Sequence, residues 1–261
     1  MNLFEAVIIA IVEGITEYLP VSSTGHMIIT SSLLGIHKDE FTKLFEVAIQ
    51  LGAILAVVVL YWRKFFDFAR WQFYVKLLIA VIPALILGKL FSDTIDQLLE
   101  SPTTVAISML AGGIILLFID QLFKGDGIER EEQITYKKAF FIGIWQCLAM
   151  VPGVSRSASS IIGGMQQKLN RKLAAEFSFY LAVPTMCAAT GYKLLDGYKS
   201  FTDDHIKLLL VGNIVAFIVA ILAIKFFIGF LQKHGFRLFG WYRIVAGIIL
   251  LILIWQGVIE A

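Results

Sequence analysis

The sequence predicts an all-α polytopic membrane protein, built as an inverted-topology repeat with six transmembrane helices and two re-entrant helical hairpins. This prediction rests on the composition, on six long apolar stretches and on two apolar regions that are broken near the middle. Of the 261 residues, 58% are hydrophobic and 16% are charged, and the mean hydropathy is +0.81. Soluble domains carry about a quarter charged residues. The composition therefore excludes a soluble enzyme, a nucleic-acid-binding module and a disordered scaffold.

Six apolar stretches are long enough to span a bilayer, which takes about 20 residues of helix. They cover residues 44–62, 71–91, 103–123, 174–195, 206–231 and 238–258. No separate cleavable signal peptide is expected, because the first apolar run begins at Leu3 and already contains Glu13 and Glu17. The only cysteines, Cys147 and Cys187, lie in apolar runs, so we expect neither a disulfide framework nor a CxxC metal site.

Two further apolar regions, residues 3–36 and 139–166, are each interrupted by a polar segment with glycine and proline. The interruptions read PVSSTGH at residues 20–26 and PGVSRSASS at residues 152–160. Each arm is about 11 to 17 residues long, which is short for a span but suits a re-entrant hairpin. Because a bilayer tolerates non-helical backbone only where protein or water surrounds it, two such tips predict a polar cavity.

An internal repeat is indicated by three pairs of segments that align weakly, in the same order, at an offset of 131 to 135 residues. The pairs are residues 5–23 with 138–156, 75–78 with 206–209, and 111–121 with 246–256. We expect repeat halves at about 1–123 and 136–258 within a single membrane domain, residues 1–261. Each half would hold one broken hairpin and three spans, and an odd number of spans inverts the second half relative to the first.

The positive charges between the apolar stretches are divided unevenly between the two predicted sides. One side holds twelve Lys and Arg residues, in segments near 63–70, 124–138, 167–173 and 232–237. The loops of the other side hold three, namely Lys38, Lys43 and Lys199. By the positive-inside rule the first side is cytoplasmic. Both termini are therefore expected outside, and the two hairpins enter from opposite sides, with tips that can meet near the midplane.

Two carboxylates, Glu13 and Glu17, lie four residues apart and share one face of a predicted helix inside an apolar run. Because carboxylates at membrane depth are costly, the pair is a candidate catalytic pair that binds a cation or transfers a proton. The alternative is that both merely cap or bond a neighbouring helix. Their oxygens suit Mg²⁺ or Ca²⁺ better than Zn²⁺. Glu46 and Gln50, in the first span, either support this site or simply bond between helices.

The first interruption continues with hydroxyl groups and a histidine: Ser22, Ser23, Thr24 and His26. Imidazole titrates near neutral pH, so His26 is a candidate general base for Ser23, Ser22 or a water molecule. A serine beside such a base is a candidate nucleophile. The alternative role of the hydroxyls is to cap the following helix. Capping and function are compatible, because a helix N-terminus also attracts anions.

In the second interruption, Arg156 lies between Ser155 and Ser157, deep within a region that is otherwise uncharged. An arginine at this depth should face an anion or a carboxylate. Its planar guanidinium suits phosphate oxygens, and neighbouring serines, including Ser160, add hydroxyl donors for a bound substrate. The alternative is a purely structural ion pair with one of the two carboxylates of the first region.

These segments resemble those of the undecaprenyl-pyrophosphate phosphatases of the bacitracin-resistance type. The resemblance rests on EGITE at residues 13–17, followed by PVSSTGH, and on PGVSRS at residues 152–157, in the right order and spacing. It extends to residues 45–55 and 174–178 and so covers most of the chain. It implies an inverted-repeat fold with re-entrant helices, in a bacterial plasma (inner) membrane, and a membrane-embedded site that opens towards the periplasm.

The same resemblance implies the activity, which removes the terminal phosphate of undecaprenyl pyrophosphate with the aid of a divalent cation, Mg²⁺ or Ca²⁺. The reaction recycles the lipid carrier for peptidoglycan synthesis and confers bacitracin resistance. The implied roles are the acidic motif for Glu13 and Glu17, nucleophile and general base for Ser23 and His26, and pyrophosphate binding for Arg156. Hydroxyl positions are matched by Ser155 and by Ser160, which stands where the family often has threonine. The expected partners are a polyprenyl pyrophosphate lipid and the membrane, with no nucleic acid; a homodimer is left open.

Two alternatives remain at this stage. Attack by a serine and direct attack by water are both compatible with these residues. The alternative function is a lipid-carrier flippase or an inverted-repeat transporter, because broken helices that meet at the midplane are typical of transporters. A hydroxyl next to His26 and the acids favours hydrolysis, since a transporter needs a binding site but no base.

Overall fold

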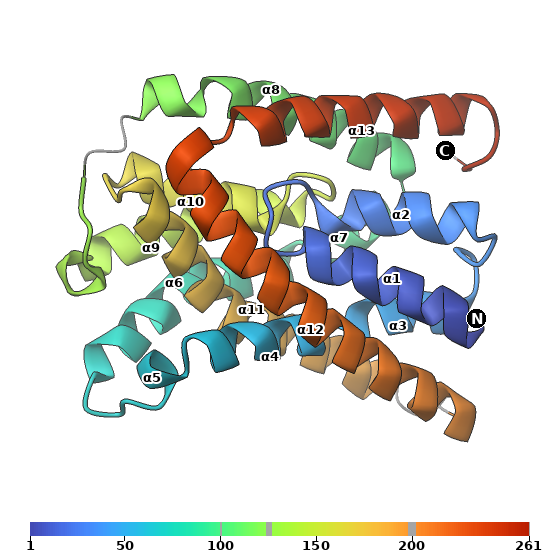
Figure 1. The fold of residues 1–261 in the computed structure, drawn as a ribbon, viewed down its shortest axis with the longest axis horizontal. Helices are drawn as coiled ribbons and strands as arrows, with labels where there is room; N and C mark the ends of the chain where they lie inside the picture. Colours follow the sequence, from blue (N-terminus) through green and yellow to red (C-terminus); the bar gives the residue numbers. More distant parts are fainter. Residues whose placement is uncertain (100, 124–126, 198–201, 261) are drawn as a thin grey trace.

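The computed structural model describes residues 1–99, 101–123, 127–197 and 202–260, and over these residues the chain is almost entirely helical (Figure 1). The described residues contain six helical segments long and apolar enough to cross a membrane, which confirms that number and the all-α class. They are Glu40–Leu60, Trp71–Leu90, Pro102–Leu122, Arg171–Leu195, Asp203–His234 and Arg237–Trp255. The first comprises α3 (Glu40–Ala48) and α4 (Gln50–Leu60), and the others belong to α6, α8, α11 (Arg171–Gly197), α12 and α13. The short helices α5 (Trp62–Phe65) and α7 (Ser92–Leu99) lie in the connections.

Both interrupted regions form two short helices with a break between them, at the predicted positions. The first consists of α1 (Leu3–Thr16) and α2 (Ser23–Leu33). The second consists of α9 (Tyr136–Gln146), a 3₁₀ turn (Cys147–Met150) and α10 (Arg156–Gln166). With 14 residues in α1 and 11 in each of the others, these α-helices are shorter than a bilayer-spanning helix of about 20 residues.

The two breaks end in the same unusual backbone geometry. Ser22 and Ser155 have φ angles of 72° and 77°, in the left-handed region that non-glycine residues rarely adopt. Each serine is the N-cap of the helix that follows, and its Oγ accepts from the backbone N–H of Gly25 or Ala158. The two positions correspond to one another in the weak sequence repeat. The two breaks therefore share this backbone geometry at positions that the weak sequence repeat pairs.

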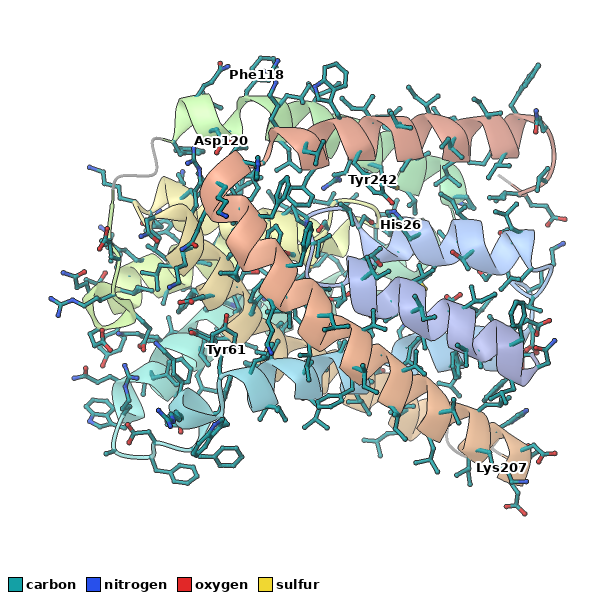
Figure 2. The ribbon with its side chains drawn as sticks, viewed as in Figure 1. His26, Tyr61, Phe118, Asp120, Lys207 and Tyr242 are labelled. Carbon is teal, nitrogen blue, oxygen red and sulfur yellow. The ribbon has the colours of Figure 1, made fainter. Side chains whose placement is uncertain are left out.

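Each broken region packs against a span from the other half of the chain. Helix α1 packs along α12, and α9 packs along α6. Helices α8 and α13 run side by side as a pair at the top of Figure 1. Both termini lie at the right of that view, and α5 lies at the left. Figure 2 shows the same division: Asp120, near the end of α8, lies towards the left, and Lys207, near the start of α12, lies at the right.

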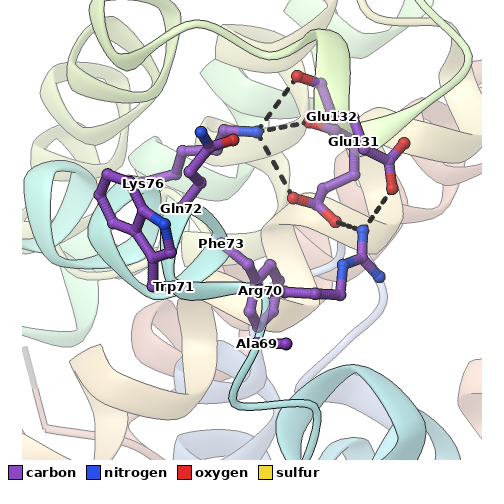
Figure 3. Close-up of a pocket in the computed structure, with 8 residues that line it drawn as sticks. All are labelled: Ala69, Arg70, Trp71, Gln72, Phe73, Lys76, Glu131 and Glu132. Carbon is purple, nitrogen blue, oxygen red and sulfur yellow. Dashed lines mark hydrogen bonds and ion pairs between the residues drawn. The ribbon is translucent and has the colours of Figure 1, made fainter.

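At the α5 end, a buried carboxylate binds the connection between α8 and α9 to the residues around α6 (Figure 3). Glu131 accepts a hydrogen bond of 2.8 Å from Arg70 and lies 3.5 Å from the Nζ atoms of Lys64 and Lys76. Lys76, which is itself buried in α6, also donates to the Glu131 carbonyl at 2.9 Å. A carboxylate buried in this way needs such partners, because its desolvation is costly. The cluster therefore holds the connection before α9 against α6.

The second break packs closely against α8 at Gly153, and a substitution there tests this contact. Gly153 has φ of 89°, and a Cβ atom at this position would lie 2.4 Å from the Val105 carbonyl oxygen. We expect Gly153→Ala to lower the free energy of unfolding by more than the 1–2 kcal/mol or so that a left-handed conformation costs alone. Thermal unfolding in detergent measures the change. The control is Gly191→Ala in α11, where a Cβ meets nothing within 4 Å; an equal loss in both variants would contradict the packing described here.

Candidate active site

The two breaks meet in a buried ion pair between Glu17 and Arg156. Nη2 of Arg156 lies 2.8 Å from Oε1 of Glu17, and the two side chains are only 12% and 7% exposed. Nη1 donates to the Ser178 carbonyl at 3.1 Å, and the guanidinium lies over the ring of Tyr18. Removed from water, the arginine and the carboxylate stabilise each other. The two tips that the sequence places in separate halves are thus in direct contact.

Glu17 also accepts a hydrogen bond from Ser23. The Ser23 Oγ lies 2.7 Å from Oε2 of Glu17, so each carboxylate oxygen accepts one hydrogen bond and keeps a second lone pair. Ser23 is the first residue of α2, and Arg156 is the first residue of α10. A hydroxyl and a guanidinium thus lie at the starts of the helices that follow the two breaks, with one carboxylate between them. A carboxylate that accepts a hydrogen bond from a serine hydroxyl has the geometry of a general base beside a nucleophile.

Glu13 lies one turn before Glu17 and is 1% exposed. Its Oε1 has no hydrogen-bond partner among the described residues. An unpartnered buried carboxylate oxygen is costly and calls for a proton, a water or a cation. No group of three or more His, Cys, Asp or Glu side chains in the described residues is arranged to hold a metal ion. Since Mg²⁺ is usually bound by one or two carboxylates together with substrate phosphates, Glu13 and Glu17 fit a hard cation when a phosphate supplies further ligands.

His26 is turned away from Ser23 and towards α13. Its Nδ1 lies 2.7 Å from the Ser22 carbonyl and its Nε2 lies 2.7 Å from the Tyr242 hydroxyl. A carbonyl only accepts, so in neutral His26 the proton is on Nδ1, and Tyr242 donates to Nε2. The two rings are parallel and 5.5 Å apart (Figure 2). His26 and Ser23 are therefore not hydrogen-bonded to each other, and the hydroxyl of Ser23 is bonded to Glu17.

The serines of the second break are bonded to the protein. Ser157 Oγ donates to the Tyr18 carbonyl at 2.7 Å, which ties α10 to the first break. Ser160 Oγ donates to the Arg156 carbonyl at 2.8 Å and lies 2.7 Å from Ser178 Oγ. Both Ser157 and Ser160 are completely buried. These two predicted substrate-binding residues thus hold Arg156 and its helix in place.

The other predicted hydroxyls lie at the helix starts. Ser22 and Ser155 cap α2 and α10. For Ser22, capping is the alternative role that the sequence suggested. Thr24 is half-buried in the first turn of α2. Outside the breaks, Gln50 accepts from Thr190 at 3.3 Å and so bonds α4 to α11, whereas Glu46 Oε1 has no partner among the described residues.

Sequence analysis missed Arg243 on α13, which is completely buried. It donates to backbone carbonyls of α8 and of both breaks, namely Ser108, Met109, Pro20, Gly153 and Val154. A signal for it was present, because Arg243 is the only charged residue within the apolar stretch 238–258. A lone arginine in such a stretch is as unusual as Arg156.

The fold and the site define a polytopic membrane protein with a buried polar site where two broken helical regions meet. More particularly, the chain belongs to the bacitracin resistance protein BacA family, whose model matches residues 6–249.

Similar proteins from several bacteria match almost the whole chain. The chain is 62% identical to an undecaprenyl-diphosphatase of Flavobacterium psychrophilum, over 97% of this chain and 96% of that protein. It is 51% identical to an undecaprenyl-diphosphatase of Porphyromonas gingivalis, over 99% of both chains. It is 46% identical to an undecaprenyl-diphosphatase of Aquifex aeolicus, over 95% of this chain and 97% of that protein.

The buried ion pair predicts strong energetic coupling. We expect Glu17→Gln and Arg156→Gln each to lower the free energy of unfolding by about 3 kcal/mol, because each leaves a buried charge without its partner. The double variant should lose clearly less than the sum of the two. Thermal unfolding of the four proteins in one detergent measures the coupling. The exposed pair Lys207 and Asp204 is the matched control, with a coupling below about 1 kcal/mol; additive losses at the buried pair would contradict the contact.

Proposed function

We propose that this protein is an integral membrane phosphatase that hydrolyses undecaprenyl pyrophosphate to undecaprenyl phosphate and inorganic phosphate. The reaction recycles the lipid carrier for peptidoglycan synthesis and confers bacitracin resistance. The observation that carries the proposal is the contact of Glu17 with both Arg156 and Ser23. This contact brings together the carboxylate of Glu17, which can accept a proton, the guanidinium of Arg156, which can bind phosphate, and the hydroxyl of Ser23. Membership of the BacA family and the names of relatives that match nearly the whole chain support the same activity.

Arg156 binds the pyrophosphate. Its Nε has no hydrogen-bond partner among the described residues, so at least one donor of the guanidinium is available to a phosphate oxygen. The Ser178 carbonyl and the ring of Tyr18 hold the guanidinium while it binds. Since phosphoryl transfer depends mainly on positioning and on neutralising charge, a fixed arginine beside the terminal phosphate lowers the barrier.

The nucleophile is either Ser23 or a water molecule. In the serine route, Ser23 Oγ attacks the terminal phosphorus, its proton passes to Glu17, and undecaprenyl phosphate leaves. Water then hydrolyses the phosphoserine and restores the hydroxyl. In the water route, water attacks the terminal phosphorus directly and undecaprenyl phosphate leaves, while Ser23 donates a hydrogen bond to the phosphate. The proton of the water passes to Glu17, or to Nε2 of His26 once the Tyr242 hydroxyl no longer donates to it. Either route requires the attacking and leaving oxygens to be roughly in line.

Glu13 and Glu17 would hold the divalent cation, Mg²⁺ or Ca²⁺, together with phosphate oxygens of the substrate. When bound, the cation neutralises negative charge on the pyrophosphate. The unpartnered Oε1 of Glu13 supports this assignment, because it is a buried oxygen ligand close to the Glu17–Arg156 pair.

The chain forms an inverted-topology repeat whose two broken regions are re-entrant hairpins, with halves at about 1–123 and 136–258. The matching φ angles of Ser22 and Ser155 support the repeat, as does the reciprocal packing of α1 on α12 and α9 on α6.

The charge bias supports a plasma-membrane orientation with both termini outside and the site open to the periplasm. A homodimer stays a prediction, which the mass of the purified protein in detergent would check.

Phosphate release from undecaprenyl pyrophosphate by the purified protein, with and without Mg²⁺ or Ca²⁺, tests the function. We expect Arg156→Ala and His26→Ala to lower hydrolysis by about 10²-fold or more, since each removes a charged or proton-transferring group. Arg63→Ala and His234→Ala, at exposed positions, are the matched controls and should keep full activity.

Full hydrolysis by Arg156→Ala would contradict pyrophosphate binding by Arg156. Full hydrolysis by His26→Ala would contradict proton transfer by His26. Lipid movement across liposomes without hydrolysis by the wild type would favour the flippase. Activity that survives in Ser23→Ala excludes the serine route, and a trapped phosphoenzyme in the wild type excludes direct attack by water.

Single cysteines test the orientation. In a variant without Cys147 and Cys187, we expect a membrane-impermeant maleimide to label Lys38→Cys in intact spheroplasts. Arg63→Cys should react only after the membrane is opened, because the positive-inside rule puts it in the cytoplasm. Equal labelling of the two in intact spheroplasts would refute the orientation.

A further inference from the structure

Every N–H donor of the Arg243 guanidinium is hydrogen-bonded to a backbone carbonyl. Nε donates to Met109 at 3.3 Å, and Nη1 donates to Pro20 at 3.4 Å and to Val154 at 2.9 Å. Nη2 donates to Ser108 at 3.1 Å and to Gly153 at 2.8 Å. An arginine has five N–H donors, so none is left for a substrate. The side chain is completely buried, and it therefore acts on other residues rather than on the lipid.

The accepting carbonyls explain why an arginine is required here. Pro20, Gly153 and Val154 lie outside helices, so their carbonyl oxygens have no place in a helical hydrogen-bond pattern. Within a bilayer such groups must be satisfied by protein. One planar guanidinium reaches all three and also bonds to α8, which joins the two breaks to a common helix. Lysine has a single compact nitrogen with three donors and cannot span the same set.

The atoms that Arg243 holds are next to the reacting groups. Pro20 lies three residues before Ser23, and Val154 lies two residues before Arg156. The adjacent residue on α13, Tyr242, bonds to His26. The same turn of α13 thus contacts the segment that carries Ser23, the segment that carries Arg156, and the imidazole.

We propose that Arg243 is a positioning residue, which sets the separation between the two breaks and so places Ser23 and Glu17 against Arg156. This proposal rests on the proposed hydrolysis of undecaprenyl pyrophosphate. A displacement of about 1 Å in such a site can lower a rate by about 10²-fold. Disturbing Arg243 should therefore lower kcat much more than it raises KM.

A neighbouring glycine allows the arginine to be displaced without removing its charge. A Cβ atom at Gly112 on α8 would lie 2.3 Å from Nη2 of Arg243. Gly112→Ala should push the guanidinium off its carbonyls while every donor and acceptor remains in the chain. The matched control is Gly229→Ala on α12, where a Cβ meets nothing within 4 Å.

The experiment compares wild type, Arg243→Lys, Gly112→Ala and Gly229→Ala as full-length protein in detergent. It measures kcat and KM for undecaprenyl pyrophosphate, the Tm, and amide hydrogen exchange of peptides that cover the breaks at residues 17–23 and 151–156. We expect Arg243→Lys and Gly112→Ala to lose at least tenfold in kcat, with KM changed by less than about threefold. Exchange should rise in both breaks together and stay unchanged at residues 62–71, whereas Gly229→Ala should match wild type throughout.

Wild-type kcat in Gly112→Ala, or faster exchange confined to α8 and α13, would overturn the proposal. If Arg243→Lys does not fold, Gly112→Ala decides the question on its own. If the wild type itself releases no phosphate, the proposed function fails, and exchange in the two breaks still decides whether Arg243 holds them together.

Discussion

The rest of the site depends on the contact between Glu17 and Arg156. Each charge is buried in an apolar bundle, and neither is tolerable at that depth without the other. Their contact forces the two breaks together although they are 139 residues apart in the sequence. It also leaves the second oxygen of Glu17 to accept a hydrogen bond from the hydroxyl of Ser23. The ion pair, which the sequence offered as a purely structural alternative, is thus part of the arrangement that makes hydrolysis feasible.

Buried backbone is the second constraint, and it explains the groups around the ion pair. The breaks expose N–H and C=O groups where a membrane-spanning helix would have none. Ser22 and Ser155 satisfy N–H groups at the helix starts, and Arg243 satisfies the carbonyls. Serine hydroxyls that the sequence assigns to substrate binding therefore also cap helices and stabilise the fold. Ser23, Arg156, Glu13 and Glu17 are the groups that keep hydrogen-bonding or ligand positions for a substrate or a cation.

The extent to which the site was predictable differs from residue to residue. Glu13, Glu17 and Arg156 stood out because charges within apolar runs are rare, and a sequence shows them directly. Arg243 satisfies the same criterion but was missed, because it lies in a continuous span with no break to draw attention. The sequence predicted His26, three residues further along the chain, as the general base for Ser23, Ser22 or a water molecule. In the structure α2 directs the imidazole towards Tyr242, a residue from the last helix, and no local pattern could indicate this.

By itself, the sequence determined the class of the protein, the six apolar spans, the positions of the two breaks and the rare charges within them. These depend on composition and short-range order, which hydropathy and helix periodicity reflect directly. Only the tertiary structure decided which charges pair, which carboxylate receives the hydroxyl of Ser23, and which side chain joins the breaks. Those outcomes depend on the distances between helices far apart in the chain, and such distances are set by packing of the whole bundle rather than by any one segment.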